Sequence, residues 1–254
     1  QGVSPGARGG AAAPVAAGRG GAAGGRGGRG GRGAAPALPP NSASMEMFGG
    51  AMRITFSADG NTAYIADGAR NRRVVEVDVN TGAIKKYWGA NGAAPSDAAG
   101  SAGQFSNVSC VETSKDGMLY VCDQRNNRIQ VFKTSDGSFV KEVKVAASTL
   151  AEGSVWDIAL SADAAQRFLY VADGTNQRVR ILNRAKLEEL TAFGEGGRLP
   201  GTFYAVGSIA VDSKGNVYTG EGLEGKRIQK FIYGGIAPVT KANQGVLWPA
   251  RAAK

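Results

Sequence analysis

The chain has 254 residues, of which 43% are hydrophobic, enough for one sizeable folded domain. It holds two cysteines and no histidine, which excludes histidine-based metal sites, histidine general bases and Ser-His-Asp triads. The formal charge of +9 is concentrated at the ends, because residues 1–45 carry five arginines and residues 226–254 carry six basic residues, both without an acid.

Residues 1–45 form a Gly/Ala/Arg-rich arm with a strict three-residue glycine period. The period matches the three residues per turn of a polyproline II helix. The arginines of the arm then share a second face, away from the glycines. Since a glycine face lets backbones approach closely, we predict an extended polyproline II or polyglycine-type arm that mediates subunit association. The residues concerned are Gly18, Gly21, Gly24, Gly27, Gly30 and Gly33, with Arg26, Arg29 and Arg32.

Two other interpretations of the arm stay open. Its composition offers little apolar area to offset the entropy of ordering, which is typical of a flexible tail. It also carries Arg-Gly-Gly triplets that resemble those of RNA-binding proteins. Such segments usually add aromatic stacking, and this arm has no aromatic residue before Phe48. We therefore predict no specific nucleic acid.

From residue 46 onward, a unit of three short strands occurs four times. The second strands cover residues 64–67, 120–123, 170–173 and 218–221, and their tyrosines lie 56, 50 and 48 residues apart. That spacing is the size of a propeller blade. Fourth strands fit at 83–88, 138–145 and 186–193. We predict an all-β fold, a β-propeller of about four blades of four antiparallel strands over residues 46–235. Residues 236–254 form a basic C-terminal segment, and its apolar stretch 236–248 is a candidate strand for closing the ring.

The order of elements in each unit resembles that of the NHL-repeat family. The match covers residues 49–233: an alternating inner strand, a glycine turn, a Tyr-x-Ala-Asp strand and an Asn-x-Arg loop. The linkers 88–105 and 193–203 also resemble the family's glycine-rich passage between blades. The resemblance implies a propeller. Familiar members have about six blades, so four leaves open a closed small ring or an open ring whose faces need a partner.

Each unit also contains an acid that ends the second strand and an arginine that begins the third. Recurrence in every blade favours architecture over catalysis, because catalytic groups normally occur once. We predict that each pair bridges its loop with charge-assisted hydrogen bonds. The pairs are Asp67/Arg73, Asp123/Arg128, Asp173/Arg178 and Glu221/Arg227.

Cys110 and Cys122 lie on the two arms of one predicted hairpin. Centring the turn on residues 115–116 opposes Cys110 to Val121, whereas a loop one residue longer opposes the two cysteines directly. The longer loop predicts a cross-strand disulfide and an oxidising compartment. The alternative is two small buried thiols. The first residue is Gln1, which a removed signal peptide or a trimmed start would both explain.

The loops between second and third strands gather on one rim of a propeller. Loops on a rigid scaffold are where binding tends to occur. The rim is a candidate site for a peptide, glycan or anionic polymer, and the NHL resemblance implies RNA as a further candidate ligand. The alternative is a solvated loop set. The candidates are Arg70, Arg72, Arg125, Asn126, Asn176 and Lys226.

Some NHL-like propellers are enzymes, namely zinc lyases and calcium-dependent hydrolases. The lyases hold zinc with histidines, which this chain lacks. A calcium site would need oxygen ligands at the channel, with Glu112, Asp157 and Asn107 as candidates. The match to the hydrolases is poor. We therefore expect no catalytic residue, metal or cofactor and no membrane span. We predict a secreted or periplasmic, non-enzymatic protein that associates with itself, as an oligomer or filament.

Overall fold

A computed structural model describes residues 43–68, 70–89, 96, 98, 101–222 and 224–236. Residues 1–42 of the predicted glycine arm and all but residue 236 of the C-terminal segment 236–254 lie outside these residues. Among the described residues, no helix is long and apolar enough to cross a membrane.

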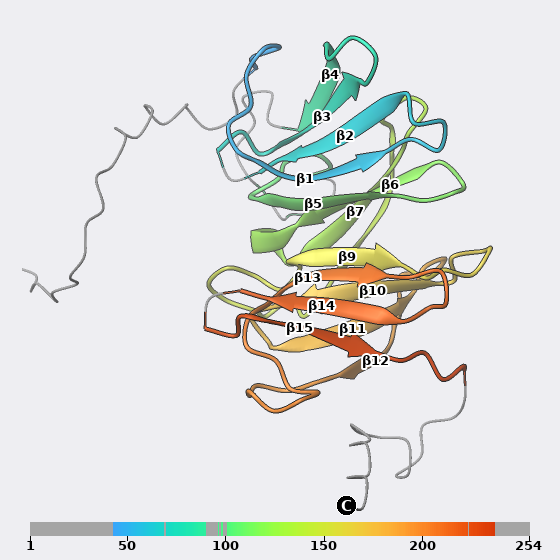
Figure 1. Ribbon diagram of the computed structural model, residues 1–254. Coiled ribbons are helices and arrows are strands. Elements are labelled where there is room, and N and C mark those ends of the chain that lie inside the picture. Colours follow the sequence, from blue (N-terminus) through green and yellow to red (C-terminus); the bar gives the residue numbers. More distant parts are fainter. Residues whose placement is uncertain are drawn as a thin grey trace, which may run out of the picture. The chain divides into compact units, whose positions relative to one another are not determined.

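The described residues form four antiparallel sheets, and in each sheet the strands pair in chain order (Figure 1). Blade 1 comprises β1 (Ala51–Phe56), β2 (Thr62–Asp67), β3 (Arg73–Asp78) and β4 (Ile84–Gly89). Blade 2 comprises β5 (Val108–Thr113), β6 (Met118–Asp123), β7 (Arg128–Lys133) and β8 (Phe139–Lys144). Blade 3 comprises β9 (Asp157–Leu160), β10 (Phe168–Asp173), β11 (Arg178–Asn183) and β12 (Glu189–Phe193). Blade 4 comprises β13 (Val206–Val211), β14 (Val217–Glu221) and β15 (Arg227–Phe231).

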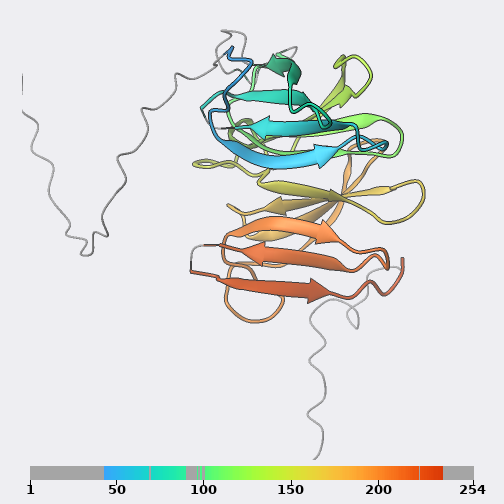
Figure 2. The same cartoon turned by 45° about the horizontal axis from the view of Figure 1, so that its top comes forward.

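The predicted fold class is confirmed: the chain is an all-β, four-bladed β-propeller of four-stranded antiparallel sheets. Blade 4 has three strands within the described part of the chain, and the stretch predicted as a further strand, 236–248, lies almost entirely outside it. The four sheets follow one another in chain order (Figure 2). Their first strands are neighbours, since β1 contacts β5, β5 contacts β9 and β9 contacts β13.

The core lies between blades and not within them. Three clusters of buried apolar side chains join blade 1 to blade 2, blade 2 to blade 3 and blade 3 to blade 4. The sheets of blades 2 and 3 are apolar on both faces, because period-2 alternation sends successive side chains to opposite faces and both faces meet a neighbour. A closed ring of four blades would have four contacts between neighbouring blades. The described residues form apolar clusters at three of them.

The linkers between blades rely on a glycine packed against a phenylalanine. Gly194 follows β12 with φ of +86°, and a Cβ on it would lie 2.1 Å from the ring of Phe203. Gly89, the last residue of β4, has φ of +81° and faces the ring of Phe105 in the same way. Both rings are buried in the cores between blades. The glycine-rich passage seen in the sequence thus places an aromatic ring directly on the backbone where one blade leads into the next.

Both hairpin registers considered for the cysteine pair occur in β5 and β6. Val108 opposes Asp123, a bulge follows, and from there Cys110 opposes Cys122. The two cysteines form the predicted disulfide, with their Cα atoms 5.0 Å apart. Both lie in the core between blades 2 and 3 and are at most 1% exposed.

Candidate functional site

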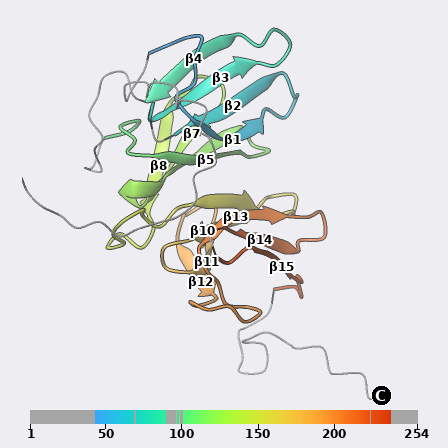
Figure 3. The same ribbon diagram turned by 60° about the vertical axis from the view of Figure 1, so that its left-hand side comes forward.

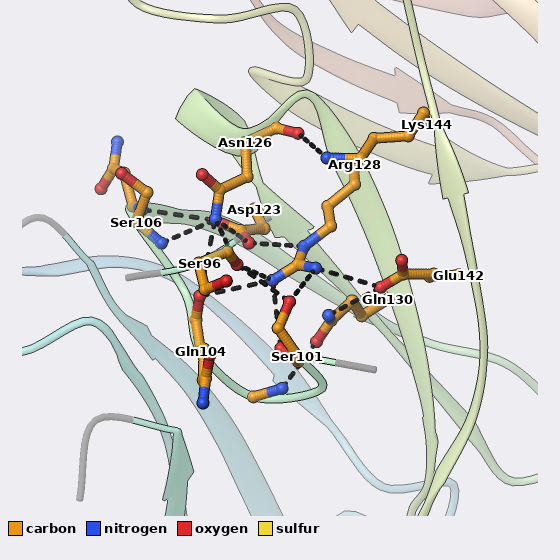
Figure 4. Close-up of polar contacts among 12 residues, drawn as sticks. Ser96, Ser101, Gln104, Ser106, Asp123, Asn126, Arg128, Gln130, Glu142 and Lys144 are labelled. Carbon is orange, nitrogen blue, oxygen red and sulfur yellow. Dashed lines mark hydrogen bonds and ion pairs between the residues drawn. The ribbon is translucent and has the colours of Figure 1, made fainter. Parts of the chain in front are cut away.

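Asp123 and Arg128 form a buried clamp at one end of blade 2 (Figure 4). The Arg128 Nε donates to Asp123 Oδ2 at 2.8 Å, and neither side chain is exposed. The rest of the guanidinium donates to the preceding linker, to the Ser101 hydroxyl at 2.8 Å and the Ser96 carbonyl at 2.7 Å. Asp123 Oδ1 accepts from the backbone N–H of Ser106 at 2.8 Å. The clamp therefore ties the linker from blade 1 to the body of blade 2.

The ionised form of Asp123 depends on these partners. Burial raises the pKa of the Asp123 carboxyl, while Arg128 and the Ser106 N–H oppose the rise. A buried carboxylate of this kind is strongly destabilising once its cation is removed. The clamp is a structural element that requires both members.

Blades 1 and 4 repeat this arrangement. Arg73 donates to Asp67 at 2.8 Å and to the carbonyls of Ser44 and Met47 in the segment before β1. In blade 4, Arg227 donates to Glu221 at 2.7 Å and to carbonyls of residues 197–202. The predicted architectural role agrees with this geometry, and each clamp fixes the chain that enters its blade.

Blade 3 departs from the prediction. The partner of Asp173 is Arg180, whose Nε donates to Asp173 Oδ2 at 2.8 Å, and not Arg178. Arg180 also pairs with Glu189 of the fourth strand at 2.9 Å, whereas Arg178 Nε is buried without a hydrogen-bond partner. The prediction for Arg178 was wrong because residues two apart share a face of a strand, and the second anion, Glu189, favours the more distant arginine.

The predicted rim residues fall into two groups. Asn126 donates to Asp123 Oδ2 at 2.8 Å, and Asn176 donates to both oxygens of Asp173 at 2.9 Å, so both amides belong to the clamps. Three of the basic side chains are more exposed to solvent than these two amides. Arg70, Arg125 and Lys226 are exposed and Arg72 is half-buried. Arg125 pairs with Glu152 at 2.9 Å, both side chains being about half exposed.

A charged group joins three of the inner strands, and its cation was missed from the sequence. Arg53 on β1 donates to Asp157 on β9 at 2.7 Å and to Glu112 on β5 at 3.4 Å. Asp157 also accepts from the backbone N–H of Ile209 on β13. A lone arginine within an otherwise apolar inner strand is the signal that could have indicated this group.

The two carboxyls of this group share a single cation, Arg53. Burial raises the pKa of Glu112 and of Asp157, and Arg53 opposes both rises. Asn107, the third predicted calcium ligand, instead donates to Gln124 Oε1 at 2.6 Å. Within the described residues, no group of three or more acids or cysteines is arranged to hold a metal ion.

The described residues leave the outward faces of blades 1 and 4 uncovered, at positions that are buried in the other blades. Ile54 on β1 opposes Ile65, as Val111, Ile158 and Ile209 oppose their partners in the other blades. Ile54 is 50% exposed, whereas its three counterparts are at most 2% exposed. We call the side of β1 that carries Ile54 and Phe56 the blade 1 end face.

Blade 4 shows the same contrast on its other side. Ile228 on β15 occupies the position of Val74, Ile129 and Val179, which are fully buried, yet it is 80% exposed. The exposed Ser208 and Ala210 of β13 lie on the same face. We call this the blade 4 end face. The sequence could not reveal either end face, because these residues follow the same pattern as their buried counterparts.

No protein-family model matches the chain, and no curated protein matches it. Solved structures do match. Hydrazine synthase of Kuenenia stuttgartiensis is 17% identical with a TM-score of 0.52, covering 72% of this chain and 45% of that one. U3-55K is 14% identical with a TM-score of 0.50, covering 72% and 51%, and the RRP9 WD40 repeats are 14% identical with a TM-score of 0.50, covering 77% and 56%.

These matches show the fold alone. The chain is a β-propeller with WD40-like structural neighbours. It spans about half the length of the structures it matches.

Proposed function

We propose that this protein is a secreted, non-enzymatic interaction protein of the NHL type that associates with further copies of itself. The observation that carries the proposal is the pair of uncovered end faces, whose apolar residues Ile54 and Ile228 stand where other blades bury theirs. Exposed apolar surface at positions built for packing is typical of a protein interface. The disulfide between Cys110 and Cys122 is consistent with an oxidising compartment.

The glycine-rich arm contributes to the same function by joining subunits into larger assemblies, such as a filament. Its three-residue glycine period is the feature that supports this role. Removal of residues 1–40 is expected to leave a folded body and to lower the mass of the assembly in light scattering. Retention of the Cys110–Cys122 disulfide and of the far-UV spectrum serves as the folding control. An unchanged assembly mass would assign association to the blades alone.

A second candidate function is binding of an anionic polymer. The exposed Arg70, Arg125 and Lys226 and the two basic ends of the chain favour it. Binding of this kind releases counterions, so affinity for a heparin or RNA probe should fall steeply as salt rises. A flat salt titration would reject the candidate.

The metal-dependent hydrolase or lyase alternative has less support, since Arg53 already pairs with both inner-strand carboxylates, Glu112 and Asp157. Elemental analysis of the purified protein tests it directly.

A further inference from the structure

We propose that a second copy of the chain covers the end faces, so that blade 4 of each copy packs on blade 1 of the other and two chains close one ring of eight blades. The inference rests on the proposed self-association and specifies its partner, stoichiometry and surface. It does not involve the glycine-rich arm.

The two end faces are complementary because they belong to opposite sides of the same repeated interface. Ile54 lies on the side that, in blades 2 to 4, packs against the preceding blade. Ile228 lies on the side that, in blades 1 to 3, packs against the following blade. Blade 4 of one copy and blade 1 of another therefore present the two halves of an interface that the chain already builds three times. Such a heterologous contact, made twice around a two-fold axis, closes on itself.

The blade 4 end face also contains an open groove of about 700 Å³, lined by Ser208, Gly220 and Ile228 among others. These three residues stand directly opposite one another across β13, β14 and β15. The equivalent row in blade 2, Cys110, Cys122 and Ile129, is covered by blade 3. The groove is therefore the place that apolar residues of a following blade fill, and the blade 1 end face supplies Ile54 and Phe56.

The remaining parts of this sequence do not repeat the blade unit. Neither residues 1–42 nor residues 237–254 contain a tyrosine, the residue that marks the second strand of each blade. A second copy carries both complementary faces.

The repeat predicts which side chains meet across the new interface. Thr55 of β1 lies 3.1 Å from Thr113 of β5, hydroxyl to hydroxyl, and β9 and β13 run side by side in the same way (Figure 3). Ala210 occupies the position of Thr55, because both oppose the tyrosine of the second strand. Phe56 occupies the position of Thr113, because each opposes the residue just before that tyrosine. In the closed ring, Ala210 of one copy therefore faces Phe56 of the other.

Disulfide trapping of the full-length chain tests this contact. The described residues contain no free cysteine, so background crosslinking is low. A mixture of Ala210→Cys and Phe56→Cys chains, unfolded and refolded together under oxidising conditions, should give a two-chain band on a non-reducing denaturing gel. Each variant alone should give almost none. No band from the mixture above the single-variant controls overturns the proposal.

Interface substitutions give an independent readout in native mass spectrometry. Ile54→Asp and Ile228→Asp should each reduce the smallest particle from two chains to one. Leu150→Asp is the matched control, since Leu150 is 83% exposed but lies on neither end face, and it should leave two chains. Because these side chains are exposed in one copy, the variants should fold, which the far-UV spectrum checks.

The outcomes separate this inference from the proposed function. A wild-type chain that is monomeric at micromolar concentration refutes both. An oligomer that survives Ile54→Asp and Ile228→Asp keeps the self-association and refutes ring closure by the end faces. An oligomer that these variants dissolve, together with the two-chain band, supports both.

Discussion

Arg178 and Arg180 lie two residues apart on β11, and Arg180 is the one that pairs with the buried Asp173. Arg180→Ala leaves that carboxylate without its cation, so we expect a loss of about 3–5 kcal/mol in the free energy of unfolding. Arg178→Ala removes no ion pair seen among the described residues and should cost about 1 kcal/mol or less. Urea denaturation of the two variants measures the difference. Equal losses would contradict the assignment.

Glu112 provides a pH-dependent prediction. Burial raises its pKa above the ordinary value of 4.5, so the folded state holds the proton more tightly than the unfolded state. Its contribution to stability is therefore complete below pH 4.5 and is lost as pH rises through the folded-state pKa. The Glu112→Gln variant has an amide that does not titrate, so its stability does not change with pH through this residue.

We therefore expect the stability of Glu112→Gln relative to wild type to increase between pH 4 and pH 7. Chemical denaturation across that range measures this relative stability. A constant difference, or one of opposite sign, would contradict the predicted direction of the shift.

The ion-pair partner of a residue was predictable from the sequence where neighbouring residues of the repeat determine it. The partners of Asp67, Asp123 and Glu221 follow from the repeat, since each acid opposes the arginine that begins the third strand. Asp173 has two arginines within reach, and the choice depends on Glu189 of another strand, which no local pattern contains. The link from Arg53 to Asp157 spans 104 residues and depends on how three blades meet.

Among the linkers, Gly194 combines a left-handed backbone with direct contact to Phe203. Gly194→Ala adds backbone strain of about 1–2 kcal/mol and a clash with a buried ring of about 1–3 kcal/mol. We expect a total loss of about 2–5 kcal/mol in urea denaturation. Gly60→Ala separates the two effects, because Gly60 has φ of +74° with open space around it. It should cost only the backbone part, and an equal cost for both variants would rule out the ring contact.

Strands were the most predictable elements. Period-2 alternation and the turn residues predicted the strands of all four units, because a hairpin depends on neighbouring residues. The bulge in β5 was not predictable in this way. It shifts only the pairing of Val108 with Asp123, whereas the length of the turn brings Cys110 opposite Cys122.

For the whole protein, closure by a second copy makes thermal stability depend on concentration. Dimerisation stabilises the folded state by mass action, so the Tm should rise with protein concentration. Ile54→Asp should remove that dependence and leave a lower, constant Tm. Differential scanning calorimetry over a hundredfold range of concentration measures both. A wild-type Tm independent of concentration would contradict closure by a second chain.

The number of blades could be predicted from the sequence, but the exposure of the outer faces of the first and last blades could not. Ile54 and Ile228 follow the pattern of buried residues, and only the structure shows that the neighbouring face is absent from the described part of this chain. A repeat specifies what each unit packs against in general. It does not specify which blade comes next, or whether that blade belongs to the same chain or to another copy.

The disulfide of blade 2 lies inside the contact between blades 2 and 3, with Cys110 and Cys122 at most 1% exposed. A small reductant can attack it only while these two blades are apart. The rate of its cleavage by dithiothreitol under native conditions therefore reports how often the contact opens, as hydrogen exchange does for amides. The bond acts as a built-in probe of blade separation, positioned at the centre of the four-blade array.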